Sequence, residues 1–307
     1  MNKDSKISVA GSRGLVGSAI VRELKLNGYT NLLCPPRSEL NLLDPVAVKW
    51  FFSVYEPEYV FLAAARVGGI IDNSKNLLQF FLENMAITTN VITNAADYGV
   101  KKLLFLGSNC IYPRDCPQPI KEEYLLTGSL EKTNEAYALA KISGVKLCEW
   151  FRAERGCNFV SAMPCNLFGP FDSFNGQTAH IIPGLISRMH AAKINNEPEF
   201  EVWGDGTARR EFLYSRDLAS ALLLIMREYN DAEPINTGSG LELTVSEIAY
   251  IIKELVKFSG RIKFDTSKPA GTPRKILDNS KIFKLGWFPQ TNLKCALQET
   301  YKYFLSE

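Results

Sequence analysis

The chain has 307 residues and a formal net charge of +2 at pH 7, with 46% of its residues hydrophobic and 22% charged. This length allows a full core and two lobes, and the composition is that of an ordinary globular protein. The near-neutral charge gives no argument for binding nucleic acid or a membrane surface. The longest apolar run, Leu218 to Met226, is far shorter than the ~20 residues of a membrane-spanning helix.

The N-terminus and the cysteines favour a cytoplasmic protein. Met1 to Lys6 is polar and leads directly into a strand pattern, which argues against a secretory signal. The 7 cysteines are scattered from Cys34 to Cys295 without a C-x-x-C pair. This usage fits a reducing compartment better than a disulfide framework or a zinc site, so we expect no bound metal.

A glycine-rich turn follows the first predicted strand, Ile7 to Ala10. It reads G-S-R-G-L-V-G, and apolar residues at helical spacing follow it as far as Gly28. Glycines let the backbone approach a pyrophosphate, which then rests on the amides and the positive dipole of the helix start. We therefore predict that a dinucleotide contacts Gly11, Ser12, Arg13, Gly14, Leu15, Val16 and Gly17.

The next predicted strand, Asn31 to Cys34, ends where a nucleotide-binding fold meets the adenosine ribose. An acidic residue there would favour NAD, but this chain has two prolines and then Arg37. A guanidinium suits the 2′-phosphate of NADP, so we predict NADP(H), with a solvated surface arginine as the alternative. The expected contact segment is Arg37, Ser38, Glu39, Leu40, Asn41 and Leu42, in which Glu39 is the residue that argues for NAD.

Two long helical patterns are candidates for a homodimer interface. After a predicted strand at Tyr59 to Ala65, a helix lies between Asn76 and Tyr98, with one stripe formed by Phe80, Asn84, Ile87 and Val91. A second helix runs from near Tyr137 to about Arg155, with one face formed by Ala140, Gly144, Leu147 and Phe151. Pairing with their copies in a dimer and packing in the core explain these faces equally well, and Asn84 would bind backbone.

The strongest chemical signal lies between Leu103 and Lys141. A buried-strand pattern ends at Ser108, and Tyr137 and Lys141 follow on a predicted helix, one turn apart on the same face. Because a nearby ammonium stabilises a phenolate, we expect Lys141 to lower the pKa of Tyr137 towards neutrality. Ser, Tyr and Lys in this order, with Y-x-x-x-K spacing, are the signature of short-chain dehydrogenases/reductases.

Strands and helices alternate as far as a predicted strand at Asn158 to Met163, and the pattern is mixed beyond it. This predicts an α/β fold: a Rossmann-like doubly wound parallel sheet with a smaller mixed α/β substrate-binding lobe. We expect a dinucleotide-binding domain at 1–164, with about 211–240 returning to it, and a mainly substrate-binding lobe at 165–307. The expected elements of the second half are a helix begun by Pro183, strands at Phe200 to Trp203 and Glu211 to Tyr214, a helix from Asp217 and a capping box of Thr244 and Glu247.

The chain resembles extended short-chain dehydrogenases/reductases acting on nucleotide sugars, and most closely the GDP-L-fucose synthases. The likeness covers nearly the whole chain and includes G-S-R-G-L-V-G-S-A-I at 11–20, R-S-E-L-N-L-L-D at 37–44, K-L-L-F-L-G-S-N-C-I-Y-P at 102–113, Y-A-L-A-K at 137–141, N-L-F-G-P at 166–170, H-I-I-P at 180–183 and V-W-G-D-G-T at 202–207. The resemblance implies NADPH-dependent 3,5-epimerisation and 4-reduction of GDP-4-keto-6-deoxy-D-mannose to GDP-L-fucose.

The resemblance also implies roles for single residues. Cys110 and His180 would be the acid-base pair that inverts C3 and C5, because hydrogens next to a ketone are weakly acidic. Tyr137 would protonate the C4 oxygen, with Ser108 orienting it and Lys141 holding the nicotinamide ribose. Further cofactor contacts are implied at Leu106, Gly107, Ser108, Asn109, Lys141, Pro164, Cys165, Asn166, Leu167 and His180, and nucleotide-sugar contacts at Arg188, Trp203, Arg210 and Arg274.

Other interpretations stay open. Cys110 can be a small buried strand-end residue, and His180 a loop histidine bonded to backbone. A 4,6-dehydratase or a 4-epimerase is the nearest rival, but a dehydratase needs an acidic pair where this chain has Asn109 and Cys110. A non-catalytic NADP-binding protein could keep the glycine loop, yet it has no reason to keep the Ser-Tyr-Lys set. We expect His190 to be an ordinary surface residue.

Overall fold

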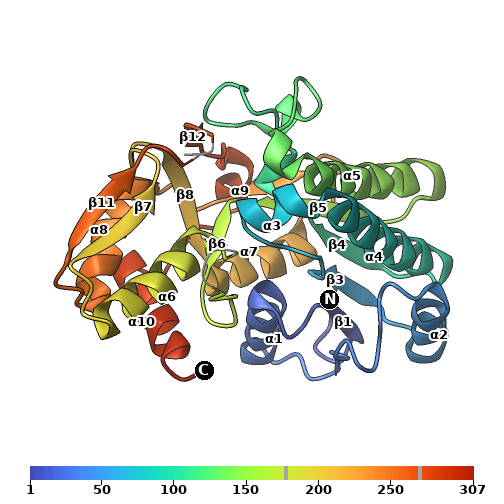
Figure 1. Cartoon of the computed structure of the whole chain (residues 1–307). Helices are drawn as coiled ribbons and strands as arrows, with labels where there is room; N and C mark the ends of the chain where they lie inside the picture. The colour runs from blue at the N-terminus through green and yellow to red at the C-terminus, as the bar shows by residue number, and fades with distance from the viewer. Residues whose placement is uncertain (176–178, 269–271) are drawn as a thin grey trace.

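The computed structural model describes residues 1–175, 179–268 and 272–307, without the side chain of residue 70. Figure 1 shows a larger lobe built on a twisted sheet and a smaller lobe beside it. Buried apolar side chains form a separate cluster in each lobe. Among the described helices, none is long and apolar enough to cross a membrane.

The larger lobe contains a six-stranded parallel sheet in the order β2-β1-β3-β4-β5-β9. Its strands are β1 (Ile7–Ala10), β2 (Leu32–Leu33), β3 (Tyr59–Leu62), β4 (Lys102–Leu106), β5 (Phe159–Pro164) and β9 (Ile235–Thr237). The chain leaves β1 first towards β2 and later returns on its other side to β3. This reversal opens a crevice at the carboxyl ends of the strands, where doubly wound sheets bind ligands. The Rossmann-like prediction is confirmed.

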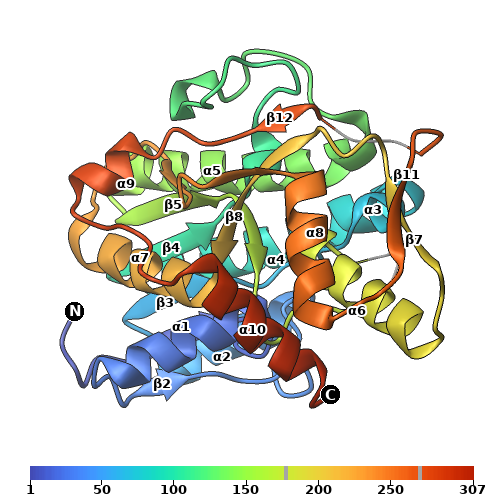
Figure 2. The same cartoon turned by 90° about the vertical axis from the view of Figure 1, so that its left-hand side faces the viewer.

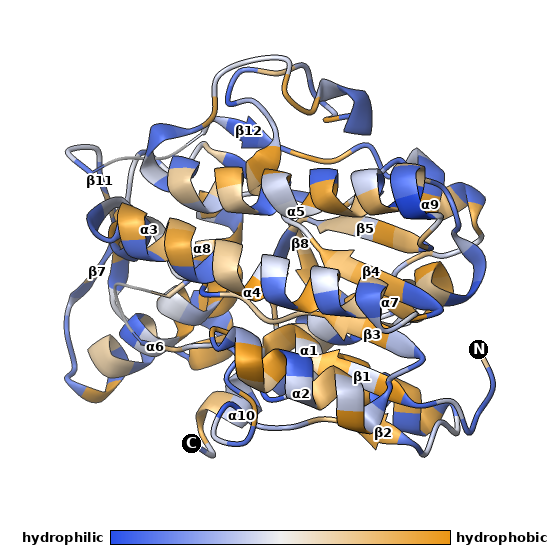
Figure 3. Ribbon diagram, turned by 90° about the vertical axis from the view of Figure 1, so that its right-hand side faces the viewer, coloured by the Kyte–Doolittle hydropathy of each residue, from blue (hydrophilic) through white to orange (hydrophobic). Residues whose placement is uncertain are grey.

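Helices cover both faces of this sheet, as Figures 2 and 3 show from opposite sides. On one face lie α2 (Pro45–Tyr55), α4 (Leu77–Asp97) and α5 (Glu135–Arg155), and on the other α1 (Leu15–Leu26) and α7 (Ser215–Glu228). The short helix α3 (Ile70–Lys75) precedes α4. Because helices shield both faces, the central strands β1 and β4 are buried along their whole length, and apart from Ser8 and Lys102 their residues are apolar rather than alternating.

The predicted interface stripes face the sheet instead of a partner. Phe80, Asn84, Ile87 and Val91 are all buried, and the Asn84 amide bonds the backbone of Arg66 and Phe80. On α5, Ala140 is buried, and a Cβ on Gly144 would lie 2.3 Å from the Phe105 ring. Core packing is therefore the correct explanation for these faces, because close helix-to-sheet contact needs small or apolar residues there.

The smaller lobe is mixed. β8 pairs with β10, β12 and β6, while β7 pairs with β11. Its strands are β6 (Asn166–Phe168), β7 (Glu199–Trp203), β8 (Arg209–Tyr214), β10 (Glu242–Thr244), β11 (Arg261–Asp265) and β12 (Arg274–Lys275). The later helices are α6 (Ile181–Ile194), α8 (Val245–Val256), α9 (Ser280–Lys284) and α10 (Leu293–Phe304), and the 3-10 turns are η1 (Asn109–Ile111), η2 (Glu122–Tyr124) and η3 (Lys132–Asn134).

Several predicted details differ from the structure. Helix α6 begins at Ile181, so Pro183 lies within its first turn, where its missing N–H costs no helix bond. Helix α7 begins at Ser215 rather than Asp217, and β3 ends at Leu62 rather than Ala65. His190 is half-buried, and its Nδ1 lies 2.8 Å from the Tyr301 hydroxyl, so it is a packing residue rather than a surface one. The capping box of Thr244 and Glu247 is present.

We propose a domain border near residue 164, with later chain returning to the first domain. Helix α7 and β9 support a returning segment at about 211–240, because both belong to the larger lobe. Leu277, Ile282 and Trp287 also belong to the larger hydrophobic cluster. A second return near 277–287 is therefore part of this proposal.

Candidate active site

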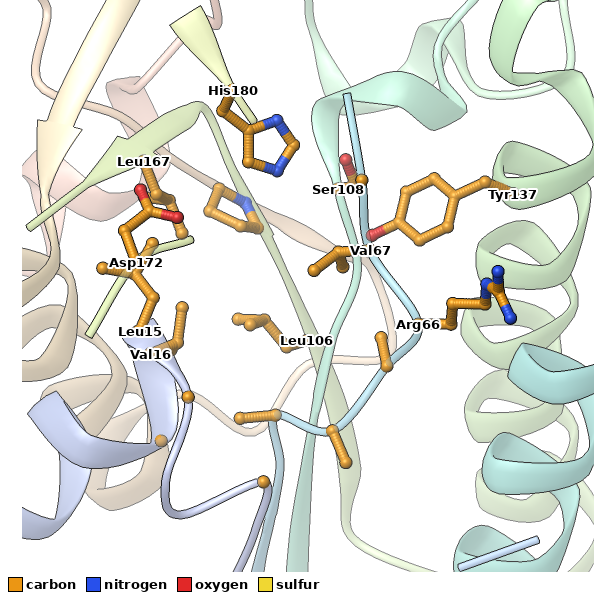
Figure 4. A pocket seen from close by; sticks show the side chains of 18 of the residues that line it. Leu15, Val16, Arg66, Val67, Leu106, Ser108, Tyr137, Leu167, Asp172 and His180 are labelled. Atoms are coloured by element: carbon orange, nitrogen blue, oxygen red, sulfur yellow. The ribbon is translucent and has the colours of Figure 1, made fainter. Parts of the chain in front are cut away.

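A cavity of about 1130 Å³ lies between the two lobes and is lined by residues of both. Its floor follows the carboxyl ends of β1, β3, β4 and β5, and α6, β7 and β8 close its other side. Figure 4 shows part of its wall, with Leu15, Leu106, Ser108, Tyr137 and His180 around one space. This is the crevice at which the strand order reverses.

The glycine loop forms one end of the cavity, and all of residues 11–17 line it. Gly11 has φ +85°, and a Cβ there would lie 2.8 Å from the Ala64 amide nitrogen. A Cβ on Gly17 would lie 2.0 Å from the Gly11 carbonyl oxygen. These two glycines let β1, β3 and α1 approach closely, which leaves the α1 N-terminus open for a pyrophosphate.

The adenosine end lies beyond β2. Residues 35–38 and 40–43 line the cavity there, whereas Glu39 does not. Arg37 is exposed on the rim. The Ser12 hydroxyl donates a hydrogen bond of 3.3 Å to the Cys34 carbonyl, which ties the glycine loop to this segment. The acidic residue that argued for NAD thus lies outside the wall, and the basic one lies within it.

Ser108, Tyr137 and Lys141 come together at the end of β4. Ser108 caps the turn η1 by accepting a hydrogen bond of 3.2 Å from the Cys110 amide, and its side chain also bonds the Tyr137 phenol. Lys141 is buried, and its Nζ donates to the Leu106 carbonyl oxygen at 2.8 Å. The helix α5 therefore presents Tyr137 and Lys141 to one strand end, as their spacing predicts.

The expected lowering of the Tyr137 pKa is wrong for the protein without ligands. Burial raises the pKa of Tyr137, and the nearby Cys110 thiol raises it further. Burial also lowers the pKa of Lys141 to about 7, so this amine is only partly charged at neutral pH. Desolvation disfavours the charged form of each group, and it is the largest cause of both shifts. A phenol that keeps its proton is suited to donate it.

Cys110 and His180 both line the cavity, on opposite lobes. His180 is the N-cap residue of α6, and desolvation by the surrounding walls lowers its pKa, so its imidazole is neutral at pH 7. The Cys110 thiol follows Ser108 on η1, and its Sγ lies 3.5 Å from Lys275 Nζ. A thiol and a neutral imidazole facing one space can act as acid and base on a ligand between them.

The sequence did not single out Lys275. It adjoins Arg274, which was proposed for substrate binding but does not line the cavity. Arg274 instead pairs with Glu242, with Nε and Nη2 at 2.7 and 2.9 Å from its carboxylate oxygens. Because successive residues of a strand point to opposite faces, only one of the two can face the cavity from β12. That residue is Lys275.

Cationic and aromatic side chains form the far end of the cavity. Arg188, Trp203 and Arg210 all line it. The Arg188 guanidinium lies 5.9 Å from the Trp203 ring centre, and its Nε donates to the Gly184 carbonyl at 3.2 Å. Burial lowers the pKa of both arginines, although guanidinium groups remain charged at neutral pH. Such a surface suits a diphosphate and a flat base.

Three buried amide atoms of the wall have no hydrogen-bond partner among the described residues: Asn73 Oδ1, Asn109 Nδ2 and Asn134 Oδ1. Buried polar atoms are rarely left unpaired, so a bound ligand is the natural partner for each. Asn134 was not recognised in the sequence because it precedes α5 without any motif of its own. Together with the glycine loop, these open positions fit a dinucleotide and a second polar ligand.

A remaining group of proposed cofactor residues lies between the glycine loop and α6. Leu106, Gly107, Pro164, Cys165, Asn166 and Leu167 all line the cavity. Among the described residues, no cluster of three or more His, Cys, Asp or Glu side chains could hold a metal ion. Apart from Asn166, the six lining residues named above are small or apolar.

Comparisons with known proteins agree on one family. The model of the "NAD dependent epimerase/dehydratase family" matches residues 7–238. GDP-L-fucose synthase 1 of Arabidopsis thaliana is 50% identical over 304 residues, covering 99% of this chain and 94% of that protein. GDP-L-fucose synthase of Escherichia coli K12 is 45% identical, with 98% and 96% covered. The solved structure of a GDP-L-fucose synthetase from Naegleria fowleri bound to NADP has a TM-score of 0.92 and 34% identity, with 100% and 95% covered.

Proposed function

Since this chain belongs to the NAD dependent epimerase/dehydratase family, we propose that it is an NADPH-dependent enzyme that converts GDP-4-keto-6-deoxy-D-mannose to GDP-L-fucose. The reaction combines 3,5-epimerisation with reduction at C4. The observation that carries the proposal is that one cavity holds Cys110 and His180 as well as Ser108, Tyr137 and Lys141. A plain reductase has no use for the first pair.

In the epimerisation, Cys110 and His180 stand on opposite lobes with the sugar between them. Inversion requires a base that removes a proton from one face of the ring and an acid that returns one to the other face. The neutral imidazole of His180 can accept a proton at pH 7 because the surrounding cavity walls desolvate the ring and lower its pKa. Cys110 supplies the exchangeable proton on the other side. C3 and C5 of the sugar both adjoin the C4 ketone, which makes their hydrogens weakly acidic.

In the reduction, Tyr137 gives its proton to the C4 oxygen. Bound NADPH supplies the hydride to C4. The raised pKa of Tyr137 keeps the phenol protonated until negative charge develops on the oxygen. The Ser108 hydroxyl hydrogen-bonds the Tyr137 phenol. It also orients the C4 oxygen of the sugar. Lys141, whose amine is held by the Leu106 carbonyl, would hold the nicotinamide ribose.

Arg188, Trp203 and Arg210 hold the GDP end of the substrate. A bidentate guanidinium suits a diphosphate, and an aromatic ring suits a base. Arg37 on the opposite rim binds the 2′-phosphate of NADPH. The cavity thus separates the two nucleotides and brings their reacting ends together beside Tyr137.

The decisive experiment is incubation with GDP-4-keto-6-deoxy-D-mannose and NADPH in deuterated water. We expect GDP-L-fucose as the product, with deuterium at C3 and C5 and one NADPH consumed for each product molecule. A 4-epimerase or a dehydratase retains its nicotinamide, so the absence of net NADPH consumption would reject the reductase. Tight NADPH binding without turnover would instead support a non-catalytic protein.

A homodimer is the assembly we propose, formed by the outer faces of α4 and α5. These helices lie side by side on the surface (Figure 3). Their exposed large apolar residues are Leu77, Leu78, Leu82, Leu139 and Trp150, exposed by 43%, 71%, 53%, 42% and 58%. A second copy would bury this patch. Leu82→Glu with Trp150→Glu should shift the sedimentation of the protein to that of a monomer. Unchanged sedimentation would reject this face.

We propose the cytoplasm as the location. All seven cysteines are free thiols. A protein with this many unpaired thiols is suited to a reducing compartment, where NADPH is also maintained. Fractionation of cells that express the protein, with detection by antibody, tests this assignment.

A further inference from the structure

Asp172 lies on the cavity wall but has no part in the proposed chemistry. It follows β6, and Figure 4 shows its carboxyl group beside Leu15, Val16 and Leu167. Oδ1 accepts a hydrogen bond of 2.8 Å from the Ser173 amide. Oδ2 is buried and has no hydrogen-bond partner among the described residues. Because buried polar atoms are rarely unpaired, a bound ligand is the natural hydrogen-bond partner for this carboxyl oxygen on the cavity wall.

The chain around Asp172 is held from two sides. Phe171 has φ +67°, a left-handed conformation that is unfavourable for a bulky residue. Its ring packs at a tilt of 37° against Tyr303 of α10, with ring centres 4.8 Å apart, and the Arg22 guanidinium of α1 lies 5.4 Å from its centre. Such strain persists where surrounding contacts fix the backbone. The carboxyl group is therefore positioned rather than free to turn to solvent.

The ionisation of Asp172 is poised near neutrality. Burial raises its pKa to about 7, against the opposing effect of the Ser173 amide. The titratable and charged residues of the adjoining elements include Arg13 before α1, Arg22, Glu23 and Lys25 in α1, His180 before α6, Lys294, Glu299, Tyr301, Lys302 and Tyr303 in α10, and Glu307 after it. Arg22 is engaged with Phe171, and Tyr303 with Glu307. Asp172 is therefore present in both its protonated and its ionised form at pH 7.

Leu15 and Val16 belong to the first turn of α1, where a dinucleotide places its pyrophosphate. We propose that Asp172 is a pH-dependent cofactor contact, which binds NADP(H) as a neutral acid that donates a hydrogen bond from Oδ2 and repels the cofactor phosphates as a carboxylate. This inference rests on the cofactor of the proposed function and is independent of its sugar substrate. Cofactor affinity then falls as the pH rises above neutrality.

The test measures NADPH dissociation constants by titration calorimetry between pH 6 and 8.5, without any sugar. For the wild type we expect binding to weaken by about tenfold for each pH unit above 7, which is the limit for one required proton. Near pH 7.5, binding should take up a proton, seen as a dependence of the heat on the ionisation enthalpy of the buffer. NADH should give the same uptake, because it shares the pyrophosphate but lacks the 2′-phosphate.

Asp172→Asn keeps a neutral donor of the same shape, so it should bind NADPH with little pH dependence and no linked proton uptake. Asp115→Asn, at a side chain that is 90% exposed, is the matched control and should behave as the wild type. If Asp172→Asn does not fold, the proton uptake measured on the wild type still tests the inference. Release of a proton on binding, or no proton exchange with either cofactor, would overturn the inference. Release would show that Asp172 binds as a carboxylate that accepts a hydrogen bond from the nicotinamide carboxamide of the cofactor, and such binding is stronger at high pH. Failure to turn over a sugar would leave these readings unaffected.

Discussion

Lys275 Nζ lies 3.5 Å from Cys110 Sγ, although the two residues are far apart in the chain. The contact follows from the strand register, because β12 pairs with β8 and sets Lys275 opposite Arg210. Arg210 also interacts electrostatically with Cys110. Two basic side chains therefore border the thiol on the side of the smaller lobe. A cationic side chain at this distance can hold the sulfur in place and stabilise negative charge that develops on a ligand beside it.

Lys275→Met should slow deuterium exchange at C3 and C5 by about tenfold or more, a modest share of what a positioned acid or base contributes. Lys275→Arg keeps the charge and should retain most of the exchange, while NADPH affinity should not change in either variant. Arg274→Met is the matched control, since its side chain turns to Glu242 and is 47% exposed. Equal losses in the Lys275 and Arg274 variants would show that the cavity-facing charge has no special role.

Arg37→Ala should weaken NADPH binding by about tenfold to a hundredfold, as expected for a lost charge-assisted contact to phosphate, and should leave NADH binding nearly unchanged. The physical reason is that only NADPH carries a 2′-phosphate for the guanidinium. Fluorescence titration with both cofactors measures the ratio. Glu39→Ala is the control, because Glu39 lies outside the cavity wall. A similar loss for NADPH and NADH would remove Arg37 from the specificity site.

Glu211→Ala should lower the free energy of unfolding by about 3 kcal/mol or more, because it leaves several buried donors unpaired. Glu211 is fully buried and accepts hydrogen bonds from the Gly240 and Leu277 amides at 2.7 and 3.0 Å and from Asn279 Nδ2 at 2.7 Å. It thereby ties β8 to two late segments of the chain. Urea unfolding measures the loss.

The conservative variant Glu211→Gln keeps one acceptor oxygen and should cost less than Glu211→Ala. As a surface control, Glu123→Gln should change stability by less than about 1 kcal/mol, because its side chain is 70% exposed and its ion pair with Lys121 is screened by water. If the buried and the exposed variants had similar effects, Glu211 would not be a structural tie.

Local sequence patterns were sufficient for the parts of the site that one short segment builds. The glycine loop, the capping box and the helical spacing of Tyr137 and Lys141 each depend on neighbours a few residues away, and all appear as predicted. The choice between Arg274 and Lys275 could not be made in the same way. It depends on which face of β12 meets β8, and a single-residue shift in register exchanges the two side chains.

Besides the register of β12, the sequence could not predict how deeply individual side chains are buried. The Tyr-Lys spacing suggested a lowered phenol pKa, but it did not show that both groups lie in a desolvated wall. In the same way, the helical stripe through Phe80 was apolar enough for either a dimer or the core. Only the position of α4 over the sheet decides for the core. Asp172 carried no motif, because its environment is assembled from α1, β6 and α10.

His180 should give the epimerisation an acidic limb that lies below pH 6.5. Its side chain remains accessible from the cavity, but the protein atoms around it desolvate the ring and lower its pKa beneath that ordinary value, so the imidazole stays neutral and able to accept a proton until the pH falls further. The rate of deuterium exchange at C3 and C5 should then fall by about tenfold for each pH unit below the lowered pKa. The same shift means that the unfolded chain binds a proton more readily than the folded one. Stability due to this group is therefore present above pH 6.5 and is lost as the pH falls below it.

His180→Gln removes both effects and isolates them from other acids in the protein. Its residual exchange should be much slower and should lack the acidic limb, and below pH 6.5 its stability should depend less on pH than that of the wild type. His190→Gln is the matched control, because that ring contacts Tyr301 in the smaller lobe and does not line the cavity. An acidic limb that persists in His180→Gln would assign the proton transfer to another group, and Cys110 would then have to act without this partner.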